Sequence, residues 1–266
     1  MTAIIQVDGL SKSFGEVRAV NSISFHVEAG EVFGLLGPNG AGKSTTIKML
    51  TTLLPPDAGR ASIGGYDVVR HATMVRRIIG YVPQALSADG SLTGYENLLV
   101  FAKLYDIPRR ERERRIREAL KFMGLEEAAD RLVRTYSGGM IRRLEIAQSM
   151  LHQPTVLFLD EPTIGLDPVA RAAVWGHIMR LREEFGMTIL LTTHYMEEAD
   201  GLCRRIAIMH LGNIAAIGTP AELKASIGDP EATLDKVFVH YTGGELETGG
   251  SYREASRARR TARRLG

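Results

Sequence analysis

The chain has 266 residues, of which 44% are hydrophobic and 24% charged, and its formal net charge is +2. These proportions are ordinary for a globular protein and allow a sizeable buried core. Residues 251–266 carry six arginines and one acid, so this segment has a charge of +5 and the rest of the chain −3. A main body that is not basic argues against nucleic-acid binding, and we expect no nucleic-acid partner.

A single cysteine, Cys203, excludes an intramolecular disulfide and favours the reducing cytoplasm. The N-terminal residues show no cationic start followed by an apolar stretch, so we expect no signal peptide. No apolar run approaches the roughly 20 residues needed to span a bilayer. Any role at a membrane is therefore expected to depend on a partner protein.

The first predicted strands differ from those in the middle of the chain. Residues 4–7 and 23–27 alternate apolar and polar side chains, as half-exposed antiparallel strands do. Residues 32–36, 155–159 and 188–191 are continuous apolar runs, which are typical of parallel strands buried on both faces. The sequence therefore predicts an antiparallel subdomain beside a parallel sheet.

Helical patterns over residues 43–54 and 169–185 follow two of the buried strands, so we predict an α/β fold. A late hairpin is expected from residues 205–209 and 214–217, with its turn at residues 211–213.

Residues 84–154 contain no strand pattern, but helical patterns cover residues 95–105, 109–123 and 140–151. We predict a helical subdomain, at about residues 85–154, inserted into one domain that spans residues 1–243. Residues 244–266 turn polar and arginine-rich and are expected to form a flexible basic tail.

The strongest motif lies between the buried strand at residues 32–36 and the helix that follows it. Its pattern, G-x-x-x-x-G-K-S, is that of a phosphate-binding loop, whose backbone amides and helix N-terminus attract phosphate groups. Lys43 is expected to reach the terminal phosphates and Ser44 to ligate Mg²⁺. The predicted nucleotide-binding residues here are Gly37, Pro38, Asn39, Gly40, Ala41, Gly42, Lys43, Ser44 and Thr45.

Two acidic residues end the buried strand at residues 155–159. Asp160 is expected at the carboxyl edge of the sheet beside the phosphate loop, where it can hold Mg²⁺. Glu161 is placed to act as general base for an attacking water. An acid at this position can also merely cap a turn, so this assignment depends on the phosphate loop upstream.

Shortly before that strand, Ser137, Gly138 and Gly139 open a helix in the sequence Tyr136-Ser-Gly-Gly-Met140. This sequence resembles the LSGGQ signature of ABC ATPases, with Tyr136 in place of Leu and Met140 in place of Gln. The resemblance covers roughly residues 3–243. It implies a P-loop NTPase with a RecA-like core, ATP hydrolysis, and bound ATP and Mg²⁺.

The same resemblance assigns the remaining landmarks. Gln84 is similar to the Q-loop glutamine that contacts Mg²⁺, and His194 to the switch histidine that senses the γ-phosphate. Residues 164–167 resemble the D-loop that crosses to the partner subunit. Phe14 resembles the aromatic residue that stacks on adenine, although an aromatic side chain at a strand end often only covers the core.

Residues 230–238 resemble the element that follows the core in exporters of drugs and lipids, and residues 136–144 resemble antibiotic-resistance exporters of the daunorubicin type. The family resemblance implies a head-to-tail dimer of ATPase subunits, expected to be a homodimer, in which Ser137–Gly139 of one subunit meets the ATP of the other. It also implies a separate transmembrane permease and a peripheral location at the cytoplasmic face of the membrane. We expect export of a drug-like or lipid-like substrate; a nutrient importer and a soluble ABC protein remain alternatives.

Overall fold

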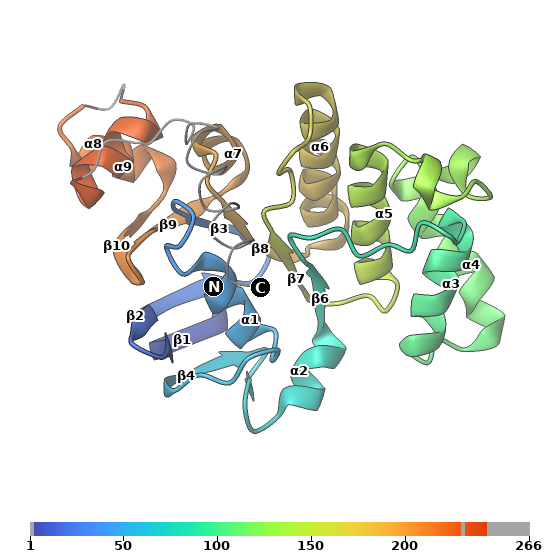
Figure 1. Ribbon diagram of the computed structural model, residues 1–266, viewed down its shortest axis with the longest axis horizontal. Helices are drawn as coiled ribbons and strands as arrows, with labels where there is room; N and C mark the ends of the chain where they lie inside the picture. Colours follow the sequence, from blue (N-terminus) through green and yellow to red (C-terminus); the bar gives the residue numbers. More distant parts are fainter. Residues whose placement is uncertain (1–2, 230–231, 244–266) are drawn as a thin grey trace, which may run out of the picture.

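The computed structural model describes residues 3–229 and 232–243, and Figure 1 shows two sheets with helices around them. The basic tail predicted for residues 244–266 lies outside the described residues, as do Pro230 and Glu231 of the exporter-like segment.

The first sheet is antiparallel and has the strand order β2-β1-β4-β5. Its strands are β1 (Ala3–Phe14), β2 (Val17–Glu28), β4 (Ala58–Ile63) and β5 (Tyr66–Asp67). The alternating patterns at residues 4–7 and 23–27 lie within β1 and β2, which are both much longer than expected. Pairing of Ile5 with Val27 and of Phe14 with Val17 makes these two strands a long hairpin.

The second sheet has the order β10-β9-β3-β8-β7-β6. Strands β3, β6, β7, β8 and β9 run parallel, and only β10 at the edge is antiparallel. Their bounds are Val32–Leu36 for β3, Ile79–Val82 for β6, Val156–Asp160 for β7, Thr188–Thr193 for β8, Arg205–His210 for β9 and Asn213–Gly218 for β10. The three central strands β3, β7 and β8 are buried along their whole length, as their continuous apolar sequences predict.

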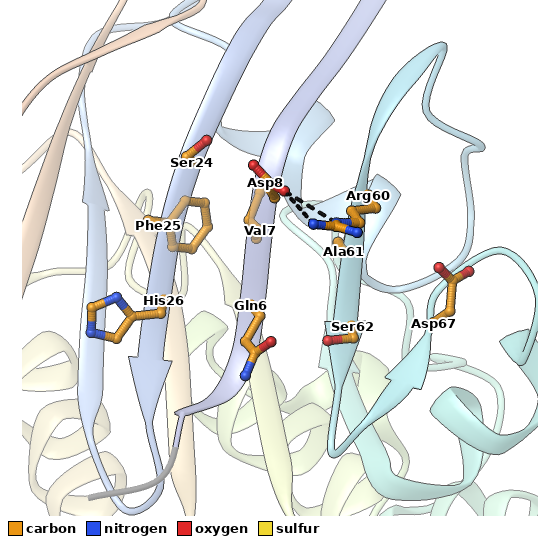
Figure 2. Close-up of a pocket in the computed structure, with 10 residues that line it drawn as sticks. All are labelled: Gln6, Val7, Asp8, Ser24, Phe25, His26, Arg60, Ala61, Ser62 and Asp67. Atoms are coloured by element: carbon orange, nitrogen blue, oxygen red, sulfur yellow. Dashed lines mark hydrogen bonds and ion pairs between the residues drawn. The ribbon is translucent and has the colours of Figure 1, made fainter.

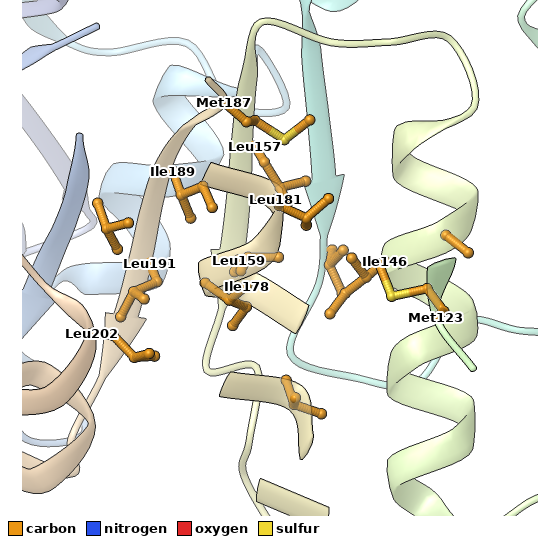
Figure 3. Close-up of a cluster of buried hydrophobic side chains, with 14 of the residues drawn as sticks. Met123, Ile146, Leu157, Leu159, Ile178, Leu181, Met187, Ile189, Leu191 and Leu202 are labelled. Carbon is orange, nitrogen blue, oxygen red and sulfur yellow. The ribbon is translucent and has the colours of Figure 1, made fainter. Parts of the chain in front are cut away.

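Alternate residues of the central strands belong to two hydrophobic cores, one on each face of the sheet. Phe33 and Phe158 face the antiparallel sheet and helix α1 (Lys43–Leu50), and Phe33 stacks on Phe25 of β2 with ring centroids 5.4 Å apart. Leu157, Leu159 and other side chains on the opposite face pack against the helices of the second core (Figure 3). The central sheet is therefore covered on both faces, as a buried parallel sheet requires.

The other helices are α2 (Ala72–Ile78), α3 (Gly94–Leu104), α4 (Arg109–Phe122), α5 (Gly138–Met150), α6 (Pro168–Phe185), α7 (Met196–Leu202), α8 (Pro220–Ser226) and α9 (Leu234–Thr242). Residues 84–154, all of which the structure describes, contain helices and no strand of a sheet. Helices α3, α4 and α5 form a group at one end of the molecule (Figure 1).

Helix α1 is shorter than the helix predicted for residues 43–54. It ends at Leu50, and Thr52 then adopts a left-handed conformation with φ of 65°. The amides of Leu53 and Leu54 both turn back to the carbonyl of Lys48. A left-handed residue ends an α-helix, and the apolar periodicity that continues through Leu54 does not reveal it.

No helix in the described part of the chain is long and apolar enough to cross a membrane.

Candidate active site

The phosphate loop joins β3 to α1 and packs tightly against the rest of the fold. Gly42 has φ of +103°, and a Cβ atom there would lie 2.4 Å from the carbonyl oxygen of Ala19. A Cβ atom at Gly37 would lie 2.3 Å from the carbonyl oxygen of Met209. Only glycine fits at these two positions, so the loop follows one path between β2 and β9.

Helix α1 begins directly after this loop, and the unpaired amides of its first turn point toward the region that the loop surrounds. Lys43, the first residue of the helix, is only 4% exposed. Its Nζ donates hydrogen bonds to the carbonyl oxygens of Gly37 at 2.7 Å and Pro38 at 3.1 Å. The loop backbone and the Lys43 side chain therefore lie around the same small region at the N-terminus of α1.

The carboxyl end of β7 lies beside this helix start. Ser44 Oγ donates a hydrogen bond to Asp160 Oδ1 at 3.0 Å, and Thr192 Oγ1 of β8 donates to the same oxygen at 2.6 Å. Two hydroxyl groups from neighbouring elements thus hold one carboxylate at the edge of the sheet. Strands β7 and β8 pair in parallel with Asp160 opposite Thr192, which explains the contact.

Glu161 has a strained backbone with φ of +49°, a region that residues other than glycine rarely adopt. Its amide donates to the carbonyl oxygen of Thr192 at 3.2 Å and to Thr192 Oγ1 at 2.9 Å. These two contacts hold the strained conformation and direct the carboxylate toward the phosphate loop.

Three side chains from different elements converge on the carboxylate of Glu161. Lys43 Nζ lies 3.2 Å from Oε1, while Gln84 Nε2 lies 3.3 Å and His194 Nδ1 3.2 Å from Oε2. Burial raises the pKa of this carboxyl, but the adjacent His194 imidazole and the Lys43 charge together outweigh burial and lower the pKa below its ordinary value. The carboxylate is therefore ionised at neutral pH.

The oxygen donors at this edge fit a magnesium ion. Mg²⁺ is typically held by one or two carboxylates together with substrate phosphates, and Ser44 Oγ and Asp160 Oδ1 are ligands of this hard-oxygen type. Within residues 3–229 and 232–243, no group of three or more His, Cys, Asp or Glu is arranged to hold a metal. The donor set suits a cation whose coordination a phosphate-bearing ligand completes.

The second predicted anion-binding helix start is separate from the first. Ser137 caps α5, and its Oγ accepts a hydrogen bond from the amide of Met140 at 3.3 Å. Helix α6 and strand β7 lie between α5 and α1 (Figure 1). Within this chain, Ser137, Gly138 and Gly139 are therefore not brought to the phosphate loop.

The predicted D-loop packs directly beside this second helix start. Asp167 caps α6 by accepting hydrogen bonds from the amides of Val169 and Ala170. A Cβ atom at Gly139 would lie 2.8 Å from Ala170 Cβ, and one at Gly138 would lie 3.3 Å from Leu166 Cδ2. The segments expected to face a partner subunit are thus adjacent to each other.

Phe14 ends β1 at the tip of the hairpin, and its side chain is 52% exposed. The facing strand β2 continues from Val17 to Ala19, whose carbonyl is the group that excludes a side chain at Gly42. Phe14 therefore lies on the hairpin end that approaches the phosphate loop, with an exposed ring.

Thr192 belongs to this site but is not among the residues predicted for it. The apolar run at residues 188–191 predicts a strand that ends before Thr192, whereas β8 extends to Thr193. The register of β7 and β8 then places Thr192 opposite Asp160.

A hollow on the outer face of the antiparallel sheet lies away from all of these residues. Figure 2 shows that residues of β1, β2, β4 and β5 line it, with an ion pair between Asp8 of β1 and Arg60 of β4. It contains none of the predicted site residues, and we assign it no part in the site.

The fold and the site together define an ATPase of the P-loop class. A family model described as ABC transporter matches residues 20–164. The daunorubicin/doxorubicin resistance ATP-binding protein DrrA of Streptomyces peucetius is 49% identical over 227 residues, which cover 85% of this chain and 68% of that protein. The Nod factor export ATP-binding protein I of Paraburkholderia xenovorans is 45% identical over 224 residues, or 84% of this chain and 73% of that protein.

Solved structures give the same result. A structure described as an ATP binding subunit of an ABC transporter has a TM-score of 0.79 and 33% identity, covering 90% of this chain and 99% of that one. A dimeric ATP-binding cassette in a post-hydrolysis state with ADP and phosphate has a TM-score of 0.72 and 27% identity, covering 81% and 98%. The chain belongs to the ABC transporter family. Within that family it is an ATP-binding, ATP-hydrolysing subunit. The predicted fold class, the ATPase activity and the resemblance to daunorubicin-type resistance proteins are confirmed.

Proposed function

We propose that this chain works with a separate transmembrane permease and uses Mg²⁺-dependent ATP hydrolysis to export a drug-like or lipid-like substrate. The observation that carries the hydrolytic part is the convergence of Lys43, Gln84 and His194 on Glu161 beside the phosphate loop. The export part is supported by relatives named for daunorubicin/doxorubicin resistance and for Nod factor export. The proposed location is the cytoplasmic face of the membrane, held there by the permease.

In this proposal the phosphate loop and the amides of Lys43, Ser44 and Thr45 bind the phosphates. Ser44, Gln84 and Asp160 would hold Mg²⁺, which neutralises charge on the phosphate oxygens. Phe14 provides an aromatic ring for the adenine.

Glu161 is the proposed general base for the attacking water, and His194 orients it. The ion pair with Lys43 is one cause of the lowered pKa of Glu161.

The proposed dimer follows from the separation of α1 and α5 (Figure 1). A nucleotide on the phosphate loop of one subunit lacks the Ser137–Gly139 helix start of the same subunit. A twofold head-to-tail arrangement brings the Ser137 segment of each subunit to the other's nucleotide, so a homodimer completes two sites.

Everted membrane vesicles that contain the chain and the membrane protein that copurifies with it test the direction of transport. Export predicts ATP-dependent accumulation of doxorubicin inside these vesicles, and Lys43→Ala should abolish it. An importer would instead drive its substrate out of the vesicles. Absence of any copurifying membrane protein would favour a soluble ABC protein and contradict the proposal.

A further inference from the structure

An exposed segment between β6 and α3 carries Gln84. Residues 84–87 are all exposed, and Leu86 is 54% exposed despite its apolar side chain. A segment of this kind has few contacts of its own to hold it. Its position must therefore be set by whatever its backbone binds.

Two buried charges on α5 bind that backbone. Arg142 is 2% exposed, and its guanidinium donates to the carbonyl oxygens of Pro83 at 2.7 Å and Gln84 at 2.8 Å. Glu145 is 3% exposed, and its Oε1 accepts hydrogen bonds from the amides of Ser87 and Ala88 and from Ser87 Oγ. One residue holds the carbonyls at the start of the segment, and the other holds the amides at its end.

The two charges also bind each other. Arg142 Nη1 lies 3.0 Å from Glu145 Oε2, one helical turn away. Removing two charges from water is costly, and a buried ion pair of this kind adds little stability compared with apolar side chains of similar volume. The specific backbone groups that the pair binds therefore explain it better than a gain in stability does.

We propose that Arg142 and Glu145 are positioning residues. They fix the backbone of residues 83–88 to helix α5 and so hold the side-chain amide of Gln84 against Glu161. The proposal rests on the proposed role of Glu161 in hydrolysis. Ser137 begins the same helix, five residues or about 7.5 Å before Arg142. A displacement of α5 at Ser137 therefore moves the segment that carries Gln84.

A double variant separates positioning from stability. Arg142→Met with Glu145→Leu removes both charges together and leaves no unpaired buried ion, so the fold is retained. Ser87 is exposed and Ala88 partly exposed, so water can replace the contacts that their amides lose. Arg143→Gln is the matched control, because Arg143 lies on the same helix and donates instead to the carbonyls of Met123 and Gly124.

Hydrogen exchange and steady-state kinetics are measured on the purified full chain. In the double variant we expect the amides of residues 87–88 to exchange at least ~10-fold faster, with an unchanged unfolding midpoint. We expect kcat to fall ~10-fold while KM for ATP stays within ~2-fold, because loss of the Gln84 contact to Glu161 affects hydrolysis more than binding. Arg143→Gln should leave exchange at residues 87–88 and kcat unchanged.

Unchanged exchange at residues 87–88 in the folded double variant would show that Arg142 and Glu145 do not hold this backbone. Faster exchange with unchanged kcat would show that they hold it but do not position Gln84 for hydrolysis. The exchange measurement involves no hydrolysis, so it tests whether Arg142 and Glu145 hold residues 87–88 even in a chain without ATPase activity. Absence of ATPase activity in the wild-type chain would refute the proposed function instead.

Discussion

The N-termini of helices α1 and α5 are both suited to bind phosphate. They differ in how many side chains of the same chain surround them. At α1, Lys43 is buried and Glu161 is contacted by side chains from three other elements. At α5, Ser137 and Gly138 are exposed, and the contact of the Ser137 side chain is with its own helix. The first start is surrounded by side chains of this chain, whereas the second is exposed, and in the proposed dimer another subunit covers it.

Under the proposed function, this difference separates a site of hydrolysis from a site of subunit contact. Strain at Glu161 and a network of short contacts at α1 are the features of a site built for chemistry. In the proposed dimer, the exposed helix start at Ser137, which packs beside Leu166, is a contact surface that gains a ligand only when subunits meet. Variants at the two sites should therefore fail in different ways.

The largest effect is expected at the α1 site from Glu161→Gln. The amide keeps the shape of the side chain but cannot accept a proton, so hydrolysis should fall by roughly 100-fold or more while ATP still binds. The variant should accumulate as an ATP-bound dimer in size-exclusion chromatography. The control is Glu197→Gln, an exposed acid of α7. Near-normal turnover, or only monomer with ATP, would refute the assigned base.

An intermediate effect is expected from Thr192→Val, which keeps the volume but removes the hydroxyl that binds Asp160 and the Glu161 amide. Turnover should fall ~10-fold because the carboxylates lose their orientation, and stability should fall by about 1–3 kcal/mol. Thr51→Val is the control, because that buried hydroxyl binds only carbonyls of α1. Equal effects of both substitutions on kcat would assign Thr192 to stability alone.

The smallest effect concerns the α5 start in the absence of a partner. Ser137→Ala removes a helix cap whose hydrogen bond is 3.3 Å long, and urea unfolding of the monomer should show a loss of about 0.5–1 kcal/mol. Thr233→Ala is the control, since Thr233 precedes α9 without a side-chain capping bond. A loss several times larger would mean that Ser137 supports the fold and not only a contact surface.

The sequence predicted the α1 site better than its surroundings. The motif from Gly37 to Ser44 and the two acids at the end of β7 specify their own local geometry, and parallel strand ends must meet at one edge. The role of Arg142 was not predicted, because charged residues on a helix usually face water and only the packing of α5 buries this one.

Strand β4 was missed for a related reason. Its sequence contains Gly59 and Arg60, so its periodicity is weak, and it becomes a strand by pairing with β1. Long-range pairing of this kind depends on tertiary structure, which a local pattern does not contain.

Mixed dimers that carry Lys43→Ala and Ser137→Arg test most directly the claim that the α1 site is completed by the α5 start of another subunit. With one substitution in each subunit, both defects fall in the same composite site, and purified dimers should bind one ATP. With both substitutions in one subunit and a wild-type partner, each site carries one defect, and the dimers should bind none. One ATP per dimer in the second arrangement would contradict the account.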